Sequence, residues 1–140
     1  MGTVSASINR VTLSNSNHPA VDAPVFDPTR LQILLELEED GDYSTIKSIA
    51  GQFVEDVSTQ IANIETAIAA NDFLQTARIA HTIKGNAATF GLYQLEQIAK
   101  LIEASAKNSC RDGDAVTMCK SLREAFAAGS DALNACLAAQ

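Results

Sequence analysis

The sequence contains no tryptophan, and aromatic residues make up only 5% of its 140 residues. Hydrophobic residues make up 46%, so a core without large rings must be filled mainly by Leu, Ile, Val and Ala. That composition favours packed helices over a β-sandwich. A chain of this length suits one domain with one hydrophobic core.

Basic residues are scarce: 10 Lys and Arg stand against 17 Asp and Glu, which gives a formal net charge of -7 and a pI of about 4.6. Nucleic acid and anionic membrane surfaces repel such a chain, so neither is expected as a partner. No apolar run approaches the roughly 18 residues of a membrane span. The N-terminus also lacks the basic and apolar segments of a secretory signal, and we expect a cytoplasmic protein.

Cysteines are few as well. Cys110, Cys119 and Cys136 are an odd number, and no two of them have the spacing of a CxxC motif. This pattern is typical of reduced thiols in a cytosolic protein. We expect most of them to pack between helices.

The chain divides into an aperiodic N-terminal stretch and a helical remainder. Residues 1–25 are rich in Ser, Asn and Val without a period, which predicts a flexible tail closed by Pro24. Residues 26–140 are expected to form the folded domain. Asp27 and Pro28 supply an N-cap and a first-turn proline for a short leading helix. Its expected apolar side consists of Leu31, Leu34, Leu35 and Leu37.

Four longer helices are predicted from apolar residues that recur every three or four positions. They are expected at about residues 43–70, 72–89, 92–107 and 115–138, with no strand signal anywhere. The helix lengths and short connections predict an all-α fold, an antiparallel up-and-down four-helix bundle with a short leading N-terminal helix. In the first long helix the period runs through Ile46, Ile49, Phe53, Val57, Ile61, Ile64 and Ile68.

His81 is the only histidine in a helical pattern, since His18 falls in the predicted tail. Lys84 and Gly85 follow it by three and four residues, and these positions share one helix face. An imidazole, a cation and a piece of bare backbone therefore lie together. Glycine inside a helix costs roughly 1 kcal/mol relative to alanine, so local stability does not explain Gly85. Close approach of another molecule to His81 explains it.

A helical wheel separates the core face of this helix from the face of His81. At 100° per residue the core positions cluster roughly 220° from His81. These positions are Phe73, Thr76, Ile79, Ala80, Ile83, Ala87 and Phe90. The neighbours expected around His81 are mostly small or apolar, and we interpret them as partner-docking positions: Leu74, Ala77, Arg78, Gly85 and Ala88. The alternative is an ordinary solvated surface, and the mid-helix glycine favours docking.

Residues 80–92 combine an H-x-[IL]-K-G core with small residues and an F-G pair that ends the helix. They read Ala80-His81-Thr82-Ile83-Lys84-Gly85-Asn86-Ala87-Ala88-Thr89-Phe90-Gly91-Leu92, and Leu95 follows in the next predicted helix. This segment, in its helical context, resembles the histidine-containing phosphotransfer (HPt) domain family of two-component phosphorelays. The bundle pattern extends the resemblance over roughly residues 27–138.

The resemblance implies that His81 is the phosphoacceptor of a phosphorelay. It would take a phosphoryl group from an aspartyl phosphate on a receiver domain and pass it to the aspartate of a response-regulator receiver. The partners implied are that receiver and a hybrid sensor histidine kinase; some relatives are instead phosphorylated from ATP by a kinase domain. The chain would then be a monomeric phosphohistidine carrier without kinase activity of its own, not an enzyme.

The resemblance also implies roles for the neighbours of His81. An imidazole with an unperturbed pKa of about 6.5 keeps a neutral, nucleophilic fraction near pH 7. Glu103 matches a position where the family carries Glu or Gln facing the histidine, and would accept from Nδ1–H and fix the tautomer. Alternatively, Glu103 pairs in solvent with Lys100 or Lys107, for a few tenths of a kcal/mol.

Lys84 would stabilise charge on the phosphoryl oxygens, or else be an ordinary solvated lysine. Gly85 would let the active site of the receiver approach. No metal site or cofactor is expected in this chain, because no acidic cluster surrounds His81; Mg²⁺ would come from the receiver domain.

Three other classes of function are alternatives to a phosphorelay role. A ferritin-like metal bundle needs E-x-x-H from two helices, and the sequence has none. Hydrolysis through a nucleophilic Cys or Ser lacks a partner base, because His81 is the sole candidate and no Cys lies near it in the sequence. The serious alternative is an HPt-like adaptor that docks a receiver or kinase and regulates it without carrying phosphate. The presence of both His81 and Lys84 argues against that alternative.

Overall fold

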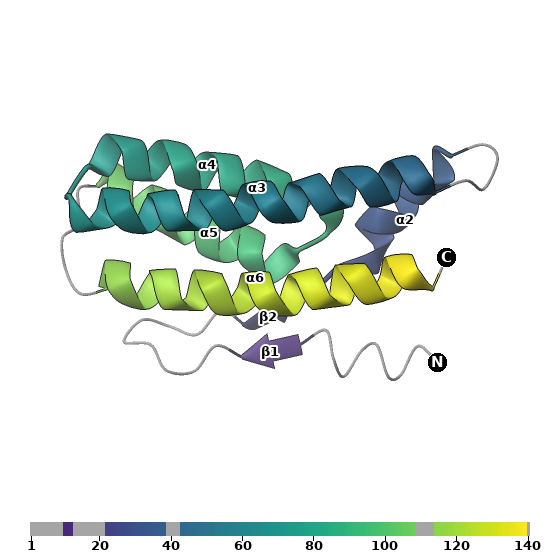
Figure 1. Cartoon of the computed structure of the whole chain (residues 1–140). Coiled ribbons are helices and arrows are strands. Elements are labelled where there is room, and N and C mark those ends of the chain that lie inside the picture. The colour runs from purple at the N-terminus through teal and green to yellow at the C-terminus, as the bar shows by residue number, and fades with distance from the viewer. Residues whose placement is uncertain (1–9, 13–21, 39–42, 109–113, 140) are drawn as a thin grey trace.

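The computed structural model describes residues 10–12, 22–38, 43–108 and 114–139. Four long helices form an antiparallel bundle, and a shorter helix, α2, lies at the end of the bundle where α3 begins (Figure 1). No helix in these described ranges combines the length and the apolar character that a membrane crossing needs. The helices are α2 (Pro28–Glu36), α3 (Ser44–Ala69), α4 (Phe73–Phe90), α5 (Tyr93–Lys107) and α6 (Asp114–Ala138).

The predicted all-α bundle is confirmed, and each long helix begins and ends within one residue of its expected bounds. For α4 the reason lies at its ends. The side chain of Asp72 accepts a hydrogen bond from the Gln75 amide and caps the first turn. Gly91 ends the helix in the left-handed conformation, with φ of 81°. Because only residues 91 and 92 separate α4 from α5, the two helices are held as antiparallel neighbours.

The core is built from Leu, Ile, Val and Ala, as the composition predicts, with Phe53 and Phe90 in ring contact at 4.7 Å. Two residues assigned to apolar helix sides are exposed instead. Leu37 is 70% exposed because α2 ends at Glu36, and Ile49 is 53% exposed near the start of α3. The largest side chains that are fully buried are Leu31, Ile61, Ile64, Ile83, Leu92, Leu95, Ile98, Leu122 and Leu133.

Beside the helical bundle, the structure contains one short strand pair that no sequence pattern indicated. β1 (Arg10–Thr12) pairs antiparallel with β2 (Asp22–Pro24), and β2 contacts α5. Strands of three residues are too short to leave an alternating pattern in the sequence. The division at residue 25 stays a prediction; the side chain of Val25, the last residue of the expected tail, is buried in the core.

Two of the three cysteines, Cys119 and Cys136, lie among the described residues. Cys119 is buried, and burial, the largest influence, raises the pKa of its thiol to about 11. Cys136 is half-buried in the same helix. The described cysteines therefore match the expected packing role, while Cys110 and His18 lie outside the described residues.

The short helix α2 is held against the turn between α4 and α5. The backbone amide of Asp27 donates to the Gly91 carbonyl at 2.6 Å. Arg30 donates from Nη1 to the Ala88 carbonyl at 3.2 Å and to Glu96 Oε1 at 2.7 Å. No sequence pattern indicated these contacts. They fix the C-terminal end of α4, the helix that carries His81.

Gly91→Ala is expected to destabilise the protein by more than about 1 kcal/mol. The positive φ disfavours any side chain, and a Cβ would collide with the Asp27 carbonyl oxygen. Gly51→Ala is the control, because Gly51 lies inside α3 and a Cβ there meets nothing within 4 Å. That variant should gain up to about 1 kcal/mol from helix propensity. Urea unfolding measures both, and equal stability of the two variants would contradict the expectation.

Candidate functional site

His81 lies in the middle of α4 with its side chain 67% exposed. Its Nδ1 atom lies 3.0 Å from Oε2 of Glu103 on α5, so the predicted contact between these two residues is present. The antiparallel packing of α4 and α5 brings His81 and Glu103 together. The turn at Gly91 reverses the chain, and the two helices pack along their length. The ring is held at one nitrogen, while most of its surface faces solvent.

Glu103 is 7% exposed and is surrounded by cations. Lys84 Nζ lies 2.8 Å from Oε1, and Lys107 Nζ lies 3.2 Å from Oε2, the oxygen that also contacts His81. Glu103 therefore contacts the histidine and Lys107 together, and the alternative of a pair in solvent does not describe it, because the carboxylate is buried. Lys100 forms no ion pair with any residue in the described part of the chain.

The hydrogen bond from Lys84, with further ones from Lys107 and His81, lowers the pKa of Glu103 to about 2 against the opposing effect of burial. The carboxylate is therefore ionised at neutral pH and only accepts hydrogen bonds. A neutral His81 ring must then carry its proton on Nδ1. The lone pair is left on Nε2, the nitrogen that Glu103 does not contact.

Gly85 is exposed, and a Cβ added there would meet no atom within 4 Å. No described residue of this chain therefore requires a glycine at that position. Leu74 is 65% exposed, Arg78 is exposed and Ala88 is half-buried, so these three also reach the surface. Their docking role stays a prediction.

Ala77 does not belong to the exposed face, which corrects its assignment to the docking surface. It is only 9% exposed. Ala77 lies seven residues before Lys84, which places both on the flank of α4 that packs toward α5. The wheel angle of Ala77 was close to that of His81, but a residue with a single methyl group is covered by the neighbouring helix.

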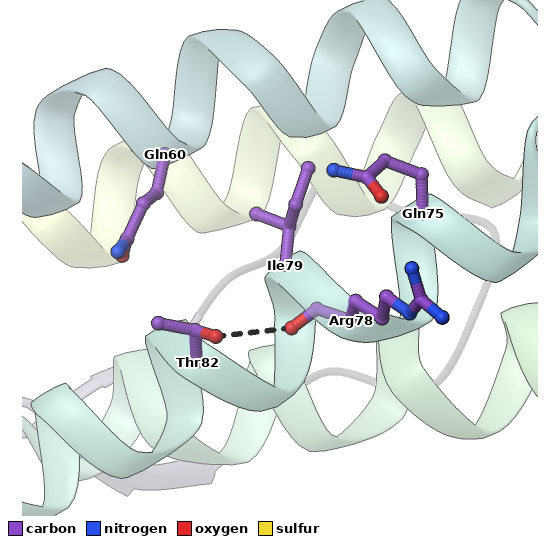
Figure 2. Close-up of a pocket in the computed structure, with 5 residues that line it drawn as sticks. All are labelled: Gln60, Gln75, Arg78, Ile79 and Thr82. Atoms are coloured by element: carbon purple, nitrogen blue, oxygen red, sulfur yellow. Dashed lines mark hydrogen bonds between the residues drawn. The ribbon is translucent and has the colours of Figure 1, made fainter.

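A small hollow, about 170 Å³ in volume, lies on the other flank of α4, toward α3 (Figure 2). Thr82, the residue after His81, donates a hydrogen bond to the carbonyl of Arg78 at 3.1 Å beside it. The sequence did not indicate this hollow, because it depends on side chains from two helices. Its lining consists of Gln60, Gln75, Arg78, Ile79 and Thr82.

The helix of the site is basic within an acidic protein. Over its 18 residues α4 contains Arg78, His81 and Lys84 and no Asp or Glu, whereas the whole chain has a net charge of -7. Among the described residues, no group of three or more His, Cys, Asp and Glu side chains is arranged to hold a metal ion. The exposed face of α4 thus presents a nucleophile among positive charges, which suits an anionic reacting group.

Glu103→Gln is expected to destabilise the fold in a pH-dependent manner. The Glu103 pKa is lowered from 4.5 to about 2, so the ionised side chain stabilises the folded state above pH 4.5, and this contribution is lost as pH falls toward 2. At pH 7 the variant should lose about 1 to 3 kcal/mol of unfolding free energy. The gap to wild type should close between pH 4.5 and about 2.

Urea unfolding at a series of pH values measures this gap. Glu65→Gln is the matched control, because Glu65 forms a bidentate salt bridge with Arg123 on the more exposed surface between α3 and α6. Nε and Nη2 of Arg123 each donate to one carboxylate oxygen of Glu65 at 2.6 Å. The effect of Glu65→Gln at pH 7 should be smaller, below about 1 kcal/mol. A gap for Glu103→Gln that stays constant from pH 7 to pH 2 would contradict the stabilising role of the charge.

Comparison with known proteins places this site in a family. Residues 48–139 match the sequence profile of the Hpt domain. Over 93 residues, or 66% of this chain, the sequence is 30% identical to multistep phosphorelay regulator 1 of Schizosaccharomyces pombe, of whose length the chain spans 30%. The crystal structure of histidine-containing phosphotransfer protein B from Pseudomonas aeruginosa PAO1 has a similar fold, with a TM-score of 0.71 at 24% identity. That match covers 81% of this chain and 94% of the other.

The profile match extends over more than half of the chain and includes α4 and α5 entirely. His81, Lys84, Glu103 and Lys107 all lie within it. The family assignment therefore rests on the sequence match, and the similarity of fold agrees with it. The chain belongs to the Hpt domain family.

Proposed function

We propose that this protein is a phosphorelay intermediate in which His81 accepts a phosphoryl group from an aspartyl phosphate on a receiver domain and passes it to the aspartate of a response regulator. The observation that carries the proposal is the exposed imidazole whose Nδ1 is 3.0 Å from the ionised Glu103 carboxylate. This arrangement keeps the Nε2 lone pair directed away from Glu103 and available to a partner.

In the transfer step, the Nε2 lone pair attacks the phosphorus atom. A bond forms between Nε2 and phosphorus while the bond from phosphorus to the aspartate oxygen breaks, and the carboxylate leaves with that electron pair. The ring then carries phosphorus on Nε2 and a proton on Nδ1, and is positively charged. Glu103, which contacts Nδ1, stabilises that charge. Transfer to the next aspartate is the reverse of these events.

Lys84 and Gly85 support the step in different ways. Lys84 is one helical turn from His81 and supplies positive charge for the phosphoryl oxygens. Gly85 has no side chain that would block access to His81, so the active site of the receiver, with its Mg²⁺, reaches Nε2. Arg78, Leu74 and Ala88 extend this surface along α4. The basic character of α4 favours approach of the acidic active site of a receiver.

The proposal includes the source and the fate of the phosphoryl group. A hybrid sensor kinase supplies the phosphorylated receiver, and this chain, which acts as a monomer, carries the group without hydrolysing ATP. The relative from Schizosaccharomyces pombe is called a multistep phosphorelay regulator, which agrees with a role in a phosphorelay of several steps.

His81→Gln should abolish phosphate uptake, because no other described side chain offers a nucleophilic ring nitrogen on this surface. The experiment incubates wild type and variant with a receiver domain that carries radiolabelled aspartyl phosphate. Wild type should become labelled, and the label should be acid-labile, as expected of phosphohistidine. Circular dichroism serves as the folding control.

Two outcomes of that experiment would overturn the proposal. Labelling of the His81→Gln variant would show that another residue is the acceptor. A wild-type protein that binds receivers but takes no label from any receiver of the source organism would favour the adaptor alternative.

Gly85→Glu should leave the fold intact and reduce phosphotransfer at least tenfold. The position has room for a side chain within this chain, so the loss would arise from collision with the partner and from the added negative charge. Ala127→Glu is the control, since Ala127 is exposed on α6, and the printed contacts of His81 and Glu103 come from α4 and α5. Rapid-quench transfer assays and thermal unfolding separate the two effects. Transfer by Gly85→Glu at the wild-type rate would refute the steric role.

A further inference from the structure

Lys107 occupies a position at the site that the proposed reaction does not yet use. Its Nζ lies 3.2 Å from Glu103 Oε2, the same oxygen that contacts Nδ1 of His81 at 3.0 Å. Lys84 holds the other oxygen, Oε1, at 2.8 Å. One buried carboxylate therefore has two cationic partners, one on each oxygen, although a single lysine would balance its charge.

The two lysines differ in where they are attached. Lys84 belongs to α4, one turn after His81, so it can turn from Glu103 toward a group bound to that ring. Lys107 belongs to α5, one turn after Glu103, and its side chain is 65% exposed. The contact between Lys107 and Glu103 lies within one helix, so it does not depend on what happens on α4.

Phosphorylation would change the balance between these contacts. A phosphoryl group carries nearly two negative charges at neutral pH, and it would attract the cation nearest to it on α4. If Lys84 leaves Oε1, Glu103 remains buried with one neighbouring charge lost. A buried carboxylate without a cation is costly, and it would be drawn away from the ring or protonated.

We propose that Lys107 is a positioning residue that holds Glu103 against Nδ1 of His81 while Lys84 turns to the phosphoryl group. The proposal rests on the proposed function. It divides the work of two cations: Lys84 serves the phosphoryl group, and Lys107 serves the carboxylate that orients the ring. This division explains why one carboxylate has two lysine partners: after transfer, Lys84 leaves Glu103 and Lys107 remains in contact with it.

The test is a double-mutant cycle with Lys84→Met and Lys107→Met, read as the fraction of protein phosphorylated at equilibrium with a phosphorylated receiver. Lys107→Met alone should lower the ratio of phosphorylated to unphosphorylated protein about two- to five-fold, the range for a partly exposed ion pair. In the Lys84→Met background the same change should have almost no effect, because no cation then leaves Glu103 on phosphorylation.

Two further variants complete the design. Lys107→Arg keeps the cation and should restore the wild-type ratio. Lys100→Met removes an equal charge from the same helix at an exposed position that has no ion pair in the described structure, and it should behave as wild type. The proposal is refuted if Lys107→Met matches Lys100→Met, or if its effect is the same in both backgrounds, as direct attraction between Lys107 and the phosphoryl group would produce.

A second measurement separates failure of this inference from failure of the proposed function. Carbon-13 NMR of the Glu103 carboxyl group follows its titration without any phosphate. Lys107→Met should raise its pKa above the wild-type value of about 2, and Lys100→Met should raise it less. An unchanged pKa would refute the holding role of Lys107 even if His81 is phosphorylated. If Lys107→Met raises the pKa of Glu103 but the protein takes no phosphate, the proposed function is refuted, and so is the movement of Lys84 toward a phosphoryl group. Only the contact between Lys107 and Glu103 would then be supported.

Discussion

The site depends on one buried carboxylate that joins two helices. Glu103 reaches from α5 to contact His81 and Lys84 on α4, and these contacts hold the His81 ring against α5. An uncompensated charge at this depth would be expelled or neutralised, so the surrounding cations are a condition for the carboxylate to be there. The arrangement ties the ring orientation to the packing of α4 on α5.

The architecture was predictable because burial in helices leaves a regular trace in the sequence. Apolar residues every three or four positions gave the four long helices to within one residue, and Asp72 and Gly91 marked the ends of α4. The short pairing of β1 with β2 left no such trace. The exposure of single residues was also harder to predict. The exposure of Ala77 depends on where the neighbouring helix lies, and that of Leu37 depends on where α2 ends. The apolar pattern of a single helix contains neither piece of information.

The site was predictable to a smaller extent, and from a different source. The spacing of His81, Lys84 and Gly85 placed a reactive ring, a cation and open backbone on one helix face. The pairing with Glu103 came from the family resemblance, because no local rule says which residue of the next helix meets the ring. The contact of Lys84 with Glu103, and the simultaneous presence of Lys107, depend on side-chain conformations across two helices, which a sequence pattern does not specify.

The exposed ring in the middle of α4 also limits how many partners the protein can serve at once. Eighteen residues at 1.5 Å per residue make α4 about 27 Å long. A stable protein interface covers about 800 Å² on each partner, a patch roughly 28 Å across. In the proposed relay, donor and acceptor receivers that both need Nε2 therefore exclude each other. The proposed transfer then follows ping-pong kinetics, in which each receiver competes with the other for the same surface of α4.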